Sequence, residues 1–116
     1  NLINMKRFIT FLFLLITSTN MIFAAMEIGG VYYNLIKSSM TAVVAPSSKY
    51  SGEITIRSSV TVNGETYTVT GIMNGAFMNC TGVTSVTIPS GVKQIARNAF
   101  SGCTGLTKIS IPNTIK

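Results

Sequence analysis

The 116-residue sequence contains no histidine and no aspartate, and its three carboxylates are Glu27, Glu53 and Glu65. Without His and Asp, the usual general base is missing and the Ser-His-Asp and Cys-His arrangements are excluded. A glycosidase needs two carboxylates about 5 to 9 Å apart across a cleft. Glu53 and Glu65 are the pair that a hairpin brings near each other, but two solvated glutamates are the favoured interpretation. We expect no catalytic residues and no enzyme.

Cysteine is also scarce, with Cys80 and Cys103 as the two residues of this type. Two cysteines without histidine are too few for a closed zinc site, and we expect no metal and no cofactor. In an exported protein the two thiols can form a disulfide. Their side chains are expected to point in the same direction from adjacent coils, so buried free thiols are the favoured state and the disulfide is the alternative.

Charged residues are few, at 10% of the chain. Outside residues 1–24, seven basic residues against three glutamates leave a net charge of +4. This mild excess favours acidic partners. Nucleic-acid binding would need clustered Lys and Arg beside stacking aromatics, whereas these charges are spread singly, so we expect no nucleic-acid partner. Gly29-Gly30 and Thr81-Gly82 lack the Lys-Ser/Thr of a phosphate loop and are interpreted as turns.

The N-terminal segment has the order of a secretory signal peptide. Two basic residues follow Met5, then come the apolar run Phe8 to Ile16, a polar patch, and small residues at Ala24 and Ala25. This pattern predicts a leader and signal peptide over residues 1–24, cut after Ala24, and a secreted or cell-surface protein. The apolar run is much shorter than the roughly 20 residues of a spanning helix. An uncleaved anchor and a buried core segment are therefore the weaker alternatives, and membrane contact is expected only through the transient signal peptide.

Two blocks of the chain, residues 71–93 and 94–116, repeat each other with a period of 23. The matches fall mainly on apolar and turn residues, as stacked coils require, because each coil buries its apolar side against the next. The sequence ends in mid-pattern over Pro112 to Lys116, without a closing unit, so we expect an array that is truncated at its C-terminus. The ten identical pairs are Ile72/Ile95, Ala76/Ala99, Phe77/Phe100, Cys80/Cys103, Thr81/Thr104, Gly82/Gly105, Thr84/Thr107, Ile88/Ile111, Pro89/Pro112 and Lys93/Lys116.

A third copy lies upstream, where residues 53–60 align with residues 85–92 and nine extra residues follow. The insert holds Asn63-Gly64 between alternating β-formers, which predicts a hairpin. Residues 25–70 are thus predicted to form an N-terminal β cap with a first partial coil and the inserted hairpin. The segment Ala76 to Cys80 is too short for a full helix, so one turn of helix or 3₁₀ is the expected return.

The repeat resembles a known family. Val83-x-x-Val86-x-Ile88 fits the leucine-rich repeat pattern, and AF-x-x-C-T-G-[VL]-T-x-[VI]-x-IP resembles the BspA-like leucine-rich repeats of bacterial surface proteins, over about residues 27–116. The resemblance implies a mainly β solenoid, a leucine-rich repeat array of 23-residue coils with a parallel sheet on its inner face. It also implies surface exposure and adhesion to host matrix proteins or other cells, although protist proteins carry the same repeats.

The outward-facing row of the predicted sheet is the candidate ligand-binding face. Phe77 and Phe100 could form a stacking ladder for ligands, but they are expected to pack in the core. Plain solubility of an exposed strand face is the alternative. We expect a secreted adhesion or protein-binding module; the rival hypotheses are a spacer or targeting domain of a larger secreted enzyme and a structural surface array. By period-two alternation, the candidate face holds Glu53, Thr55, Ser85, Thr87, Lys108 and Ser110.

Overall fold

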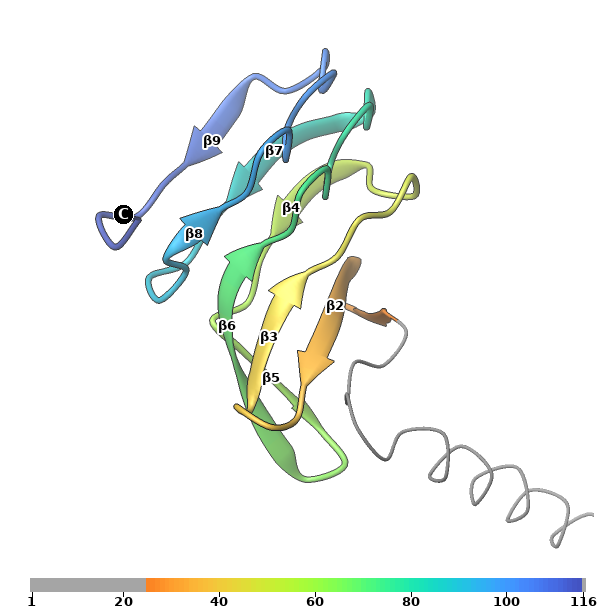
Figure 1. The fold of residues 1–116 in the computed structure, drawn as a ribbon. Coiled ribbons are helices and arrows are strands. Elements are labelled where there is room, and N and C mark those ends of the chain that lie inside the picture. The colour runs from red at the N-terminus through yellow and green to blue at the C-terminus, as the bar shows by residue number, and fades with distance from the viewer. Residues whose placement is uncertain (1–24, 116) are drawn as a thin grey trace, which may run out of the picture.

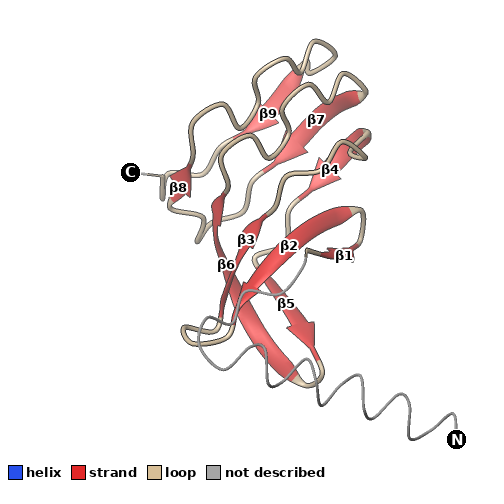
Figure 2. Cartoon of the chain, turned by 45° about the vertical axis from the view of Figure 1, so that its right-hand side comes forward, coloured by secondary structure: helices blue, strands red, loops and turns tan. Residues whose placement is uncertain are grey.

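The computed structural model describes residues 25–115, and this part of the chain consists of strands and turns in two sheets. Figure 2 shows strands and loops without a helix in the described residues. The predicted signal peptide, residues 1–24, lies outside them. The first sheet contains β1 (Met26–Ile28), β2 (Val31–Ile36), β3 (Thr41–Val44), β5 (Ser59–Val62), β6 (Glu65–Ile72) and β8 (Gln94–Ile95), and the second contains β4 (Gly52–Thr55), β7 (Val83–Thr87) and β9 (Lys108–Ser110).

The first sheet is mixed, with the order β1-β2-β3-β6-β5 and with β8 paired to β6. In β2 the residues Val31, Tyr33 and Leu35 are buried while their neighbours are half-buried, as a strand with one face on a core requires. The predicted hairpin is confirmed, because β5 and β6 pair antiparallel around Asn63 and Gly64. These two residues have φ values of 52° and 79°, which are the positive values that a type I′ turn needs.

The second sheet is parallel, as the family resemblance implied, with the order β4-β7-β9. Ser85 pairs with Lys108, 23 residues further along the chain, and Gly71 pairs with Gln94 at the same spacing in the first sheet. The parallel pairing of β3, β6 and β8 was not predicted, since the sequence indicated one parallel sheet. Figure 1 shows this second ladder running alongside β4, β7 and β9.

The expected helical or 3₁₀ return at Ala76 to Cys80 is wrong, because the segment forms turns. The backbone N–H groups of Phe77 and Asn79 donate to Ala99 and Ser101 in the next unit, each at 2.7 Å. Gly75 and Asn79 also have positive φ values, 67° and 61°, which a right-handed helix does not allow. The segment therefore bonds to the next unit through two of its five N–H groups and closes local turns with the other three.

The core lies between the two sheets and contains a row of aromatic rings. Tyr50 packs against Phe77 with ring centroids 4.3 Å apart and planes tilted by 42°, and Phe77 stacks on Phe100 at 5.2 Å with nearly parallel planes. Phe77 is fully buried, whereas Phe100 is half-buried. Tyr32 meets Tyr50 edge-on at the other end of the row. The row joins the N-terminal strands to both repeated units.

The buried hydroxyl of Tyr50 bonds to the backbone of strand β2 and to that of the residue after β3. It donates to the Ala45 carbonyl at 2.7 Å and accepts the Tyr32 N–H at 3.1 Å. We expect Tyr50→Phe to lower the free energy of unfolding by about 1–3 kcal/mol, because the substitution leaves both backbone groups without this partner. Urea unfolding followed by far-ultraviolet circular dichroism measures this loss.

Tyr67→Phe is the matched control for this prediction. The Tyr67 ring is as buried as that of Tyr50, each 3% exposed. Its hydroxyl, however, donates to the exposed Glu65 carboxylate at 3.2 Å, where water replaces the lost bond. A loss for Tyr67→Phe as large as that for Tyr50→Phe would contradict the role given to the Tyr50 hydroxyl.

Candidate protein-binding face

Strands β4, β7 and β9 place all six predicted face residues on one side of the second sheet. The buried Ile54 and Val86 alternate with them along the strands and point into the core. Five of the six are exposed and Ser85 is half-buried. The register forms two rows across the strands, Glu53–Ser85–Lys108 and Thr55–Thr87–Ser110. We call this set of six residues the outer face.

Two threonines, one of them at a β-bulge, also line the outer face, and period-two alternation missed both. Val83 lies opposite Gly52 and Ser85 lies opposite Glu53, so Thr84 is the extra residue of β7. The N–H of Thr107 donates to the Thr84 carbonyl at 3.0 Å, and its hydroxyl donates to the same oxygen at 3.3 Å. Both threonines line a hollow of about 410 Å³ on the outer face. The sequence did offer a signal for these two residues, because threonine occupies the same position in both repeated units.

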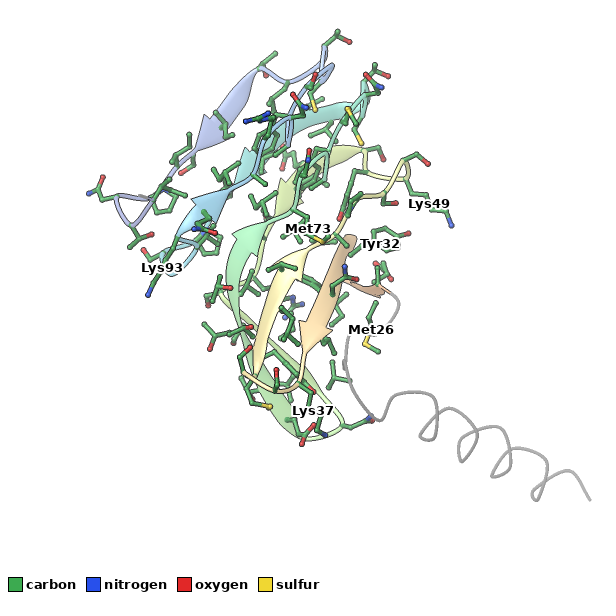
Figure 3. All side chains as sticks on the ribbon, viewed as in Figure 1. Met26, Tyr32, Lys37, Lys49, Met73 and Lys93 are labelled. Atoms are coloured by element: carbon green, nitrogen blue, oxygen red, sulfur yellow. The ribbon has the colours of Figure 1, made fainter. Side chains whose placement is uncertain are left out.

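The ion pair found among the described residues lies outside the outer face. Away from this face, Lys37 donates to the Glu65 carboxylate at 2.9 Å. This bond raises the pKa of Lys37 and lowers the pKa of Glu65. Figure 3 places Lys37 at the end of the molecule that carries the β5–β6 hairpin. Glu53 lines the hollow and Glu65 lines a separate cavity, so the two glutamates do not share one cleft.

The two cysteines are free thiols in the structure. The Cys103 thiol donates to the Phe77 carbonyl at 2.9 Å, and the Cys80 thiol donates to the Ser47 carbonyl at 3.3 Å. Each cysteine thus bonds to the backbone of an earlier segment. Cys80 is buried, as the favoured interpretation expected, whereas Cys103 is half-buried. Burial raises the pKa of the Cys80 thiol, which makes it a weak nucleophile.

Metal-binding and membrane-spanning features were searched over residues 25–115. No group of three or more His, Cys, Asp or Glu side chains gathers there in a metal-binding arrangement. Within the same residues, no helix has the length and apolar character to cross a membrane.

Residues 53–116, more than half of the chain, match the family model described as BspA type Leucine rich repeat region (6 copies). This chain belongs to the BspA-type leucine-rich repeat family. The match begins at Glu53, the first residue of the outer face, and extends over both repeated units. Leucine-rich repeat domains generally mediate protein–protein interaction. A search of curated proteins gave no significant match.

Solved structures support the leucine-rich repeat fold of this BspA-type chain. A leucine-rich repeat protein from Bacteroides ovatus is 32% identical with a TM-score of 0.68, covering 78% of this chain and 24% of its own. One from Bacteroides capillosus is 27% identical with a TM-score of 0.67, covering 80% and 69%. A leucine rich cell surface protein from Faecalibacterium prausnitzii is 33% identical with a TM-score of 0.63, covering 78% and 24%. The chain spans about a quarter of the first and third.

Proposed function

We propose that this BspA-type protein is exported to the cell surface, where it binds other proteins through the outer face and mediates adhesion to host matrix proteins or to other cells. The supporting observation is the segregation of side chains on β4, β7 and β9. Polar residues form two rows over a hollow, while apolar residues of the same strands fill the core. One similar structure is named a leucine rich cell surface protein.

The export step rests on the signal-like order of residues 1–24. The proposed architecture is a solenoid of 23-residue coils, supported by the 23-residue shift between paired strands. A row of coils extends the outer face in one direction, and multiple copies on a cell add avidity. A non-enzymatic role fits a sequence that has neither His nor Asp to act as a general base.

The test is binding of the purified protein to immobilised matrix glycoproteins and to whole cells, at low and physiological salt. We expect saturable binding that the double substitution Thr87→Arg/Ser110→Arg weakens about tenfold, because two bulky charges then fill the centre of the face. The matched control is Thr61→Arg/Thr66→Arg. These two threonines are also exposed and paired across strands, but they lie on the hairpin.

Three results would count against this function in different ways. No saturable binding by the unaltered protein at either salt concentration would rule out adhesion and favour a spacer or a surface array. Equal losses in the outer-face and hairpin variants would place the binding surface elsewhere. Ordered assembly of the protein alone, without a ligand, would favour the structural array.

A further inference from the structure

One row of the outer face carries opposite charges at its two ends. Glu53 on β4 and Lys108 on β9 lie in register with Ser85 of β7 between them. Strands of a sheet are about 4.8 Å apart, so the Cα atoms of the two charged residues are separated by about 10 Å. Both side chains are exposed and both line the hollow.

Neither charge is neutralised by another group among residues 25–115. Of the glutamates there, Glu27 accepts the Gly30 N–H at 2.6 Å and Glu65 binds Lys37. No hydrogen bond or ion pair within the described residues involves the carboxylate of Glu53, and none there involves the Lys108 ammonium. The two groups are therefore available to a ligand, and the hydroxyl groups around them add donors and acceptors.

We propose that this row selects a polypeptide segment that carries a basic and an acidic side chain about 10 to 13 Å apart. This inference rests on the proposed function and adds the chemistry of the partner. The basic side chain lies over Glu53 and the acidic one over Lys108. Polypeptides combine both signs of charge at this spacing, whereas a nucleic acid or an acidic glycan would meet repulsion from Glu53.

A second copy of the chain is a poorer occupant. The row and the hydroxyl groups beside it extend over an area on the order of 100 Å², estimated from the strand spacing. A stable interface between two folded proteins needs about 800 Å² on each partner. A short extended segment matches the dimensions of the row, and repeated segments on a surface supply avidity.

The probes are three immobilised peptides of Thr and Ser, each with two charged residues four positions apart. The mixed peptide carries one Lys and one Glu, the second carries two Lys, and the third carries two Glu. Four positions put both side chains on one face of an extended segment, about 13 Å apart. The unaltered protein is expected to prefer the Lys and Glu peptide about two- to fivefold. Salt at 1 M, with a Debye length of about 3 Å, should remove the preference.

Charge reversal should change the preferred peptide in a defined way. Glu53→Lys makes the row doubly positive and should favour the two-Glu peptide, whereas Lys108→Glu should favour the two-Lys peptide. The double variant Glu53→Lys/Lys108→Glu should again prefer the mixed peptide. The single variants Glu53→Gln and Lys108→Gln should weaken the preference without reversing it, which provides a readout even if a charge reversal unfolds the protein.

Lys49→Glu is the control for net charge, because Lys49 projects from the loop before β4 and does not line the hollow (Figure 3). It should keep the preference of the unaltered protein. Equal changes in Lys49→Glu and Lys108→Glu would overturn the proposal, since they would reflect net charge alone. Dimers in light scattering that separate in Glu53→Lys would identify a second copy as the occupant and overturn it too. Saturable binding to cells without any reversal among the peptides would overturn the proposal and leave the adhesion function standing.

Discussion

Replacing Phe77 with alanine is expected to lower the free energy of unfolding by about 3–5 kcal/mol. The Phe77 side chain is fully buried and lies between the rings of Tyr50 and Phe100. Its removal opens a cavity in the core that joins the N-terminal strands to the repeats. Because a small domain is stabilised by only about 5–15 kcal/mol, the loss is a large share of the total. Urea unfolding followed by circular dichroism measures it.

Phe100→Ala is the internal control, since it makes the same change at the equivalent position of the next unit. Phe100 is half-buried and stacks on one ring, that of Phe77. The Phe100 ring buries less apolar surface on folding than the Phe77 ring. The expected loss in the free energy of unfolding is therefore below about 2 kcal/mol. Equal losses for the two variants would contradict the view that Phe77 is the centre of the aromatic row.

The repeat and the alternation of side chains could be predicted from the sequence because they depend on local chemistry. Val86 and Ile88 are buried around the exposed Thr87, as period-two alternation requires. Asn63-Gly64 predicted its hairpin because few other residue pairs adopt two consecutive positive φ values. The six residues of the outer face were placed correctly for the same reason, while their role in binding stays a prediction.

Structural features that depend on hydrogen bonds to a neighbouring unit could not be predicted from local sequence patterns. The return at Ala76 to Cys80 has the length of a helical turn, but the N–H groups of Phe77 and Asn79 bond to the next unit. The bulge at Thr84 and the β3–β6–β8 ladder likewise arise from pairing between distant segments. The pattern of the single sequence gives the apolar and polar faces of a strand, but it does not give the hydrogen-bond register that places Thr84 at a bulge beside the hollow.

Gly105→Ala is expected to destabilise the last unit by about 2–3 kcal/mol, although it adds a single methyl group. A Cβ atom at Gly105 would overlap the carbonyl oxygen of Thr81, a backbone atom of the preceding unit. Backbone atoms cannot rotate away as a flexible side chain does, so the two coils must separate. The Thr107 N–H bond to the Thr84 carbonyl lies beside this contact. Hydrogen exchange should therefore show lower protection of the Thr107 amide, together with a lower urea midpoint.

Gly82→Ala separates this close approach from the general cost of replacing a glycine. Gly82 occupies the equivalent place in the first unit, yet a Cβ there would meet the Ser51 Cβ at 3.4 Å, which is an ordinary van der Waals contact. We expect a clearly smaller loss for Gly82→Ala. Similar losses for the two variants would mean that glycine is needed in the Cys-Thr-Gly motif for its own backbone conformation. A large loss for Gly105→Ala alone would mean that the close approach of the two units requires glycine at this position. Strand pairing sets the spacing between the units at about 4.8 Å.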